Sequence, residues 1–143
     1  MVILNSSGKP QLVAALRAHL GASVIVCQEH HCRGADLIDL QHDALDLGWS
    51  LVGANAHRTA KDGLSAGVAI AARAGARLGK VGTSFDHSPT VALGRVTAAW
   101  VNVGPPSGIV VISVYLFHTE GMTARNREVL RSAFAVARNY GSP

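Results

Sequence analysis

The sequence contains little cysteine, few aromatic residues and no long apolar segment. Cys27 and Cys32 are the only cysteines among 143 residues, too few for a disulfide framework, which leaves the compartment open but favours an intracellular over a secreted protein. No uncharged apolar run approaches the roughly 18 to 20 residues that cross a bilayer, so we expect no membrane span. Met1 to Leu4 lacks a basic leader and a long apolar region, so we expect no signal peptide.

The residues that are present suit one packed domain with a basic surface. Hydrophobic residues make up 48% of the chain and charged residues 15%, so disorder is not expected, and the length predicts a single domain over residues 1–143. The net charge of +4 and the pI of about 9.6 favour a polyanionic partner such as nucleic acid. Basic residues gather near the C-terminus, at Arg125, Arg127, Arg131 and Arg138. Such a cluster is also compatible with an ordinary solvated helix face.

The first part of the chain predicts a strand, a helix and a second strand. Val2 to Leu4 is a short apolar run that ends in turn-forming residues, typical of a buried strand. Helical spacing of leucines after Pro10, closed by Gly21, predicts a helix. Ser23 to Cys27 is β-branched and continuous, as expected of a strand covered on both faces.

The rest of the chain predicts two more helices separated by short strands. Apolar positions three and four residues apart predict an amphipathic helix between Gly34 and Gly48, with aspartates on its wet side. Thr123 is a suitable cap for a last helix, with an apolar stripe of Val129, Leu130, Ala133, Phe134 and Ala137. Strands are expected at 50–52, 66–71, 77–81, 95–103 and 109–116, the last two as a hairpin across the loop from Gly104 to Gly108. Together these elements indicate an α/β fold.

Two polar side chains stand where the first two predicted strands end. Glu29 follows the buried strand 24–27, and Asn5 follows the strand 2–4. The carboxyl ends of strands are where open α/β sheets place their sites, so neighbouring strands would bring both residues to one edge. A carboxylate there suits a Mg²⁺ ion whose other ligands are waters and substrate phosphate. The alternative is an ordinary loop acid beside an asparagine bonded to its own backbone.

Four short motifs follow one another along the chain: Asn5-Ser6-Ser7-Gly8, Cys27-Gln28-Glu29, Gly67-Val68-Ala69-Ile70 and the strand ending at Tyr115. Their order resembles the endonuclease/exonuclease/phosphatase superfamily, which includes apurinic endonucleases and the endonuclease domains of non-LTR retrotransposons. The resemblance covers Val2 to about Tyr140 and implies a partial four-layer α/β sandwich of the metal-dependent phosphoesterase type. Each motif is short, and their shared order is the stronger signal.

The resemblance also implies roles for individual residues. Glu29 would bind the catalytic Mg²⁺ or Mn²⁺, and Asn5 and Tyr115 would act at the scissile phosphate. Asn126 and Arg127, in the start of the last helix, would contact substrate. The implied function is hydrolysis of phosphodiester bonds, with nucleic acid as the expected partner.

Two later motifs of the family are not found. A strand ending in Gly-Asp-x-Asn and a Ser-Asp-His motif would supply the residues on the other side of the phosphorus. Ser84-Phe85-Asp86-His87 has the composition of the second motif, but it is one residue too long and precedes Tyr115, so we interpret it as coincidence. We therefore expect a domain truncated before its C-terminal motifs and inactive alone, because in-line hydrolysis needs groups on both sides.

Other interpretations remain open. Cys27, His30, His31 and Cys32 form a compact group, but structural zinc sites usually combine two distant ligand pairs, which disfavours zinc. A non-catalytic module or degenerate relic is the main alternative, in which the basic C-terminal helix binds nucleic-acid phosphates with salt-dependent affinity. Exposed edges of a half-sheet would also favour self-association with another chain.

Overall fold

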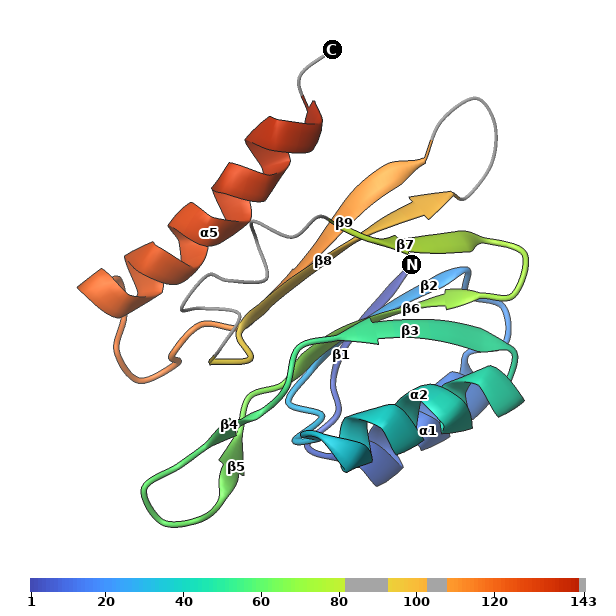
Figure 1. The fold of residues 1–143 in the computed structure, drawn as a ribbon, viewed down its shortest axis with the longest axis horizontal. Helices are drawn as coiled ribbons and strands as arrows, with labels where there is room; N and C mark the ends of the chain where they lie inside the picture. The colour runs from blue at the N-terminus through green and yellow to red at the C-terminus, as the bar shows by residue number, and fades with distance from the viewer. Residues whose placement is uncertain (82–92, 103–107, 142–143) are drawn as a thin grey trace.

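The computed structural model describes residues 1–81, 93–102 and 108–141, and it shows a layered α/β arrangement (Figure 1). Residues 104–107 of the predicted loop and the segment Ser84 to His87 lie outside the described residues. No helix in the described part of the chain is long and apolar enough to cross a membrane.

A four-stranded sheet forms the centre of the N-terminal half. Its strand order is β1-β2-β6-β3, where β1 is Val2–Asn5, β2 is Val24–Gln28, β6 is Val68–Arg73 and β3 is Trp49–Gly53. β1 and β2 are parallel, whereas β6 is antiparallel to both of its neighbours. The parallel pair is joined by helix α1, Lys9–Ala18, as the strand-helix-strand pattern predicts.

A second sheet and a long helix form the C-terminal half. Its strand order is β7-β8-β9, where β7 is Arg77–Lys80, β8 is Val96–Asn102 and β9 is Ile109–Val114. β8 and β9 form the predicted antiparallel pair. Helix α5, Ala124–Gly141, follows, and Thr123 precedes it and accepts the Arg127 N–H on its carbonyl.

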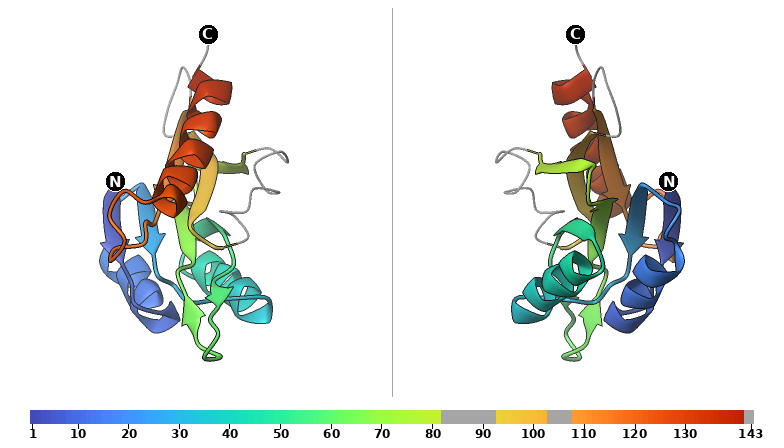
Figure 2. Two further views of the ribbon diagram at one scale, coloured as in Figure 1. Left: turned by 90° about the vertical axis from the view of Figure 1, so that its left-hand side faces the viewer. Right: turned by 90° about the vertical axis from the view of Figure 1, so that its right-hand side faces the viewer.

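The molecule has four layers: two helices, the first sheet, the second sheet and helix α5. A separate hydrophobic core lies between each pair of adjacent layers. Helices α1 and α2, the latter Ala35–Asp46, pack on one face of the first sheet around Leu16, Leu40 and Trp49. The two sheets face each other through residues such as Ile70 and Val101. Helix α5 covers the outer face of the second sheet, so helices lie on opposite sides of the molecule (Figure 2). The predicted four-layer α/β class is therefore confirmed.

Several details differ from the sequence-based expectations. The first strand was expected to be buried, but Ile3 is 64% exposed because β1 is an edge strand and only Val2 and Leu4 pack against the helical core. Phe134 was expected in the apolar stripe of α5, but it is 63% exposed. It lies about 100° around the helix from the buried Ala133, which turns it away from the sheet.

A small hairpin was not expected from the sequence. β4, His57–Arg58, pairs with β5, Leu64–Ser65, across a turn that contains Asp62 and Gly63. Strands of two residues are too short to show an apolar alternation, so no periodicity marked them.

Candidate active site

Asn5, Glu29 and Tyr115 meet at one end of the two sheets. Asn5 Nδ2 donates a hydrogen bond of 2.5 Å to Glu29 Oε2, and the Tyr115 hydroxyl donates to Glu29 Oε1. Asn5 and Glu29 are brought together by the parallel register, in which Asn5 is opposite Gln28. Tyr115 arrives from the second sheet, because it follows the last residue of β9. We refer to these three residues as the Glu29 cluster.

Two side-chain hydrogen bonds join the two sheets beside this cluster. Gln28 Nε2 donates to the Val114 carbonyl at 3.1 Å, and Ser113 Oγ donates to the Cys27 carbonyl at 3.3 Å. These bonds tie the end of β2 to the end of β9. The position of Tyr115 relative to Glu29 therefore depends on the packing of one sheet upon the other.

Glu29 has a backbone conformation that is uncommon for its residue type. Its φ angle is 60°, and that of His31 is 55°, both in the left-handed region. The turn is fixed by hydrogen bonds from the His30 N–H to the Gly67 carbonyl and from the His31 N–H to the Ala66 carbonyl. Such strain costs about 1–3 kcal/mol per residue and is concentrated at functional sites, so it supports a functional interpretation of Glu29.

His30 is the middle residue of this turn, and its side chain is completely buried. Its Nδ1 accepts a hydrogen bond of 2.9 Å from the Cys32 N–H, while Nε2 has no partner among the described residues. The ring occupies the space beside Gly67, where an added Cβ would lie 2.6 Å from His30 Cε1. Burial lowers the pKa of His30 to about 4, so the ring is neutral at neutral pH. Nothing in the sequence pattern marked His30 as the support of the Glu29 turn.

The hydrogen bonds of the Glu29 cluster set its protonation states. The bond from Tyr115 lowers the pKa of Glu29, with further lowering from Asn5 and from the nearby His31 and His118. Burial, together with the negative charge of Glu29, raises the pKa of Tyr115 to about 12. At neutral pH the cluster therefore contains a carboxylate and a neutral phenol that donates a proton in a hydrogen bond.

Asn5 is oriented by the loop that follows it. Its Oδ1 accepts hydrogen bonds from the Ser7 N–H at 3.1 Å and from Ser7 Oγ at 3.4 Å. This arrangement leaves Nδ2 to face Glu29. The neighbouring Ser6 is buried and accepts a contact of 3.2 Å from Cys27 Sγ. The loop thus fixes the amide before any ligand binds.

The donor set limits which metal ion the site could hold. Within residues 1–81, 93–102 and 108–141, no group of three or more histidine, cysteine, aspartate or glutamate side chains is arranged around a common point. Glu29 is the one carboxylate of the cluster, which fits Mg²⁺ or Mn²⁺ held chiefly by waters and substrate phosphate. Burial raises the pKa of both Cys27 and Cys32 to about 11, so these thiols stay protonated, unlike metal-bound cysteines.

Asn126 and Arg127 are not part of the Glu29 cluster. The Asn126 amide is buried, where Oδ1 accepts the Phe117 N–H at 2.7 Å and Nδ2 donates to the carbonyls of Phe117 and Gly121. Arg127 is exposed and donates to the Met122 carbonyl at 3.0 Å. Asn126 thus holds the loop after Tyr115, and the substrate contacts of both residues stay predictions.

Comparison with known proteins gives a structural match and no sequence match. No family model matches the chain, and no curated protein matches it. The crystal structure of an AP endonuclease, LMAP from Leishmania major, matches with a TM-score of 0.57 and 17% sequence identity. The match covers 96% of this chain and 46% of that endonuclease chain. At this identity the likeness shows the fold, and this chain spans less than half the length of that protein.

Proposed function

We propose that this chain is a metal-dependent phosphodiesterase domain of the endonuclease type, with nucleic acid as its substrate. The observation that carries the proposal is the convergence of Asn5, Glu29 and Tyr115, which come from two strand ends of one sheet and from a second sheet. The likeness in fold to an AP endonuclease supports it. The left-handed backbone of Glu29 is a second support, because such strain is concentrated at functional sites and Glu29 is the residue that would present the negative charge.

Glu29 is the residue that would hold Mg²⁺ or Mn²⁺. A bound divalent ion would supply neutralisation of the phosphate charge. Hydrogen bonds to Glu29 keep its carboxylate ionised, which is the form that binds a cation. The neutral hydroxyl of Tyr115 and the amide of Asn5 would donate hydrogen bonds to phosphate oxygens once substrate replaces part of their bonding to Glu29.

The cluster occupies only one side of a bound phosphate. Hydrolysis requires a group that positions the attacking water opposite the leaving oxygen, and no other carboxylate is bonded to the cluster within the described residues. We therefore propose that residues 1–143 supply the groups on one side of a phosphodiesterase site. The chain alone should bind Mg²⁺ and substrate, with little or no turnover.

The test measures Mg²⁺ binding and cleavage in parallel. Glu29→Gln should lose Mg²⁺ binding in isothermal titration, whereas Glu128→Gln, an exposed change on α5, should bind as the wild type does. Cleavage of duplex DNA with an abasic site is followed with Mg²⁺ and with a chelator. Equal binding by wild type and Glu29→Gln would remove Glu29 from any metal site and overturn the proposal.

A second candidate is a binding module without catalysis on the outer face of α5. Phe134 is exposed between Arg131 and Arg138, which lie within about one turn of it on the same helix face. An exposed aromatic ring between cations is the combination that binds single-stranded nucleic acid by stacking and phosphate contact. This candidate predicts a steep salt dependence of binding with no product.

The two candidates differ in which residues matter. Phe134→Ala combined with Arg131→Gln should weaken binding of a single-stranded oligonucleotide and make the salt slope shallower by about 1. Arg77→Gln, an exposed arginine on β7, is the matched control. Unchanged affinity in the double variant would reject the module.

A further inference from the structure

Arg95 is a buried arginine beside the Glu29 cluster. It precedes β8 and is only 7% exposed. Removing a guanidinium from water costs several kcal/mol unless its surroundings compensate, so a buried arginine needs a physical reason. Sequence patterns did not single it out.

The surroundings of Arg95 are the backbone and rings of the segment that carries Tyr115. Its guanidinium lies 3.5 Å from the centroid of the Phe117 ring and 5.1 Å from that of Tyr115. Nη1 donates to the carbonyls of Tyr115 and Leu116, at 3.4 Å each. The Arg95 carbonyl in turn accepts the Tyr115 N–H at 2.8 Å. Arg95 therefore contacts three groups of Tyr115: the aromatic ring, the backbone carbonyl and the backbone N–H.

We propose that Arg95 is a positioning residue that fixes Tyr115 against Glu29. The inference rests on the proposed function, since it assigns Arg95 a part in preparing that site. Two strand ends, those of β2 and β9, have to meet for the Tyr115 hydroxyl to reach Glu29. A guanidinium bonded to the backbone of residues 115 and 116 and stacked on residues 115 and 117 restricts the segment at both the ring and the main chain.

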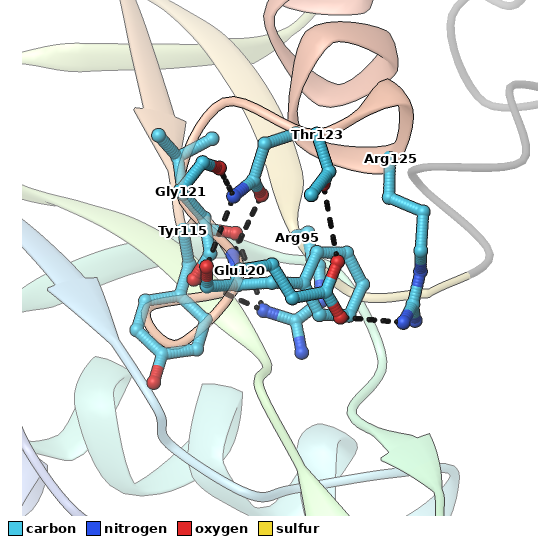
Figure 3. Close-up of polar contacts among 9 residues, drawn as sticks. Arg95, Tyr115, Glu120, Gly121, Thr123 and Arg125 are labelled. Atoms are coloured by element: carbon cyan, nitrogen blue, oxygen red, sulfur yellow. Dashed lines mark hydrogen bonds and ion pairs between the residues drawn. The ribbon is translucent and has the colours of Figure 1, made fainter.

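The stack continues beyond Arg95 to the first turn of α5. Arg125 lies 3.8 Å from the centroid of Phe117, so two guanidiniums are stacked on this ring. Arg125 also donates to Glu120 at 2.6 Å, and Thr123 donates to the same carboxylate at 3.2 Å (Figure 3). A guanidinium over the face of an aromatic ring is attracted by the ring quadrupole, more strongly where water is excluded. Tyr115, Arg95, Phe117 and Arg125 thus form one layered unit that ends in a carboxylate.

Lysine would not reproduce this arrangement. A guanidinium is planar and uses its face for stacking and its edge for hydrogen bonds, whereas an ammonium is a compact point charge. Arg95→Lys keeps the charge and most of the apolar stem but loses the plane. Arg95→Lys therefore removes the stacking that positions the Tyr115 ring but keeps a cation near Glu29, so the two effects can be told apart.

The test observes Tyr115 directly and needs neither metal nor turnover. Tyr115 and Tyr140 are the only tyrosines, so protein labelled with fluorotyrosine gives two fluorine resonances, and Tyr140→Phe leaves that of Tyr115 alone. In this background, Arg95→Met and Arg95→Lys should both shift or broaden the Tyr115 resonance toward that of a freely rotating ring. Arg77→Met should leave it unchanged.

An unmoved resonance in Arg95→Lys would overturn the inference, and that variant retains enough of the side chain to fold if Arg95→Met does not. If Glu29→Gln binds Mg²⁺ as the wild type does, the proposed function is rejected, but the fluorine comparison of Tyr115 is still valid. Conversely, a wild type that binds Mg²⁺ through Glu29 while Arg95→Lys leaves the resonance unmoved would reject the positioning role alone. The two failures are therefore distinguishable.

Discussion

His30 and Gly67 show how closely single residues are fitted beneath the site. The histidine ring lies where the side chain of residue 67 would otherwise be. The backbone N–H of His30, in the turn that presents Glu29, donates to the Gly67 carbonyl. Because the ring is fully buried, its charged form is disfavoured in the folded protein and freely accessible in the unfolded chain.

The buried histidine makes stability depend on pH. The folded pKa of His30 is about 4 and the ordinary value 6.5, so between these values the unfolded state binds the extra proton. The free energy of unfolding should therefore fall as the pH falls through this window, by up to about 3 kcal/mol from this residue. The pKa of Glu29 is lowered in the folded protein, so Glu29 adds to this pH dependence only below the ordinary value of 4.5, where its stabilising contribution is lost as the pH falls.

Urea unfolding at about pH 7 and about pH 5 checks this prediction. His30→Asn keeps an acceptor for the Cys32 N–H but does not titrate, so its stability should vary less between the two pH values than that of the wild type. A full wild-type slope in His30→Asn would show that His30 is not its source.

Gly67 cannot accept a side chain without moving His30. Its φ angle is 87°, and a Cβ would lie 2.6 Å from the ring, so Gly67→Ala should lower the free energy of unfolding by about 2 kcal/mol or more. Gly21→Ala is the control, since no atom lies within 4 Å of its added Cβ, and it should change stability by less than about 1 kcal/mol. Chemical denaturation compares the two.

Most of the regular elements were predictable, because their patterns are local. Apolar spacing predicted a helix between Gly34 and Gly48, and α2 spans Ala35–Asp46. The same spacing failed for Phe134, which matches the apolar stripe of α5 loosely but is turned to solvent. A helix determines which residues share a face, whereas only the neighbouring sheet determines which face is buried.

The buried and exposed leucines of α2 should differ in their contribution to stability. Leu40 is fully buried in the core under the first sheet, and Leu45 on the same helix is 58% exposed. Leu40→Ala should lower the free energy of unfolding by about 2–5 kcal/mol through loss of packing. Leu45→Ala should change it by no more than about 0.5 kcal/mol. Equal effects in urea titrations would contradict the assignment of the helix face.

In the described parts of the chain each sheet ends in two edge strands, β1 and β3 in the first sheet and β7 and β9 in the second. β1 pairs only with β2, and β9 pairs only with β8. Ile3 on β1 and Ile109 on β9 are exposed apolar side chains on edge strands, whose unpaired backbone groups can pair with another chain. The predicted self-association through a sheet edge stays a prediction, and these two strands are where it would occur.

Charge on β1 should oppose such self-association. Ile3→Lys places a cation on the edge and should reduce the sedimentation coefficient at high protein concentration toward that of a monomer. Ile38→Lys is the matched control, because Ile38 is similarly exposed but lies on α2. If Ile38→Lys had the same effect as Ile3→Lys, general solubility rather than the β1 edge would be responsible.

The amino-acid sequence is enough to predict the helices, most strands and three candidate site residues at strand ends, because periodicity and turn residues act over a few neighbours. It did not determine that Glu29 adopts a left-handed conformation over a buried histidine, or that Arg95 is stacked beside Tyr115. The His30–Gly67 contact and the Arg95–Tyr115 contact each join residues 20 or more positions apart, and each exists only once neighbouring strands of a sheet have paired. The tertiary structure therefore decided how the predicted residues meet, because burial and hydrogen bonding between distant segments follow from packing.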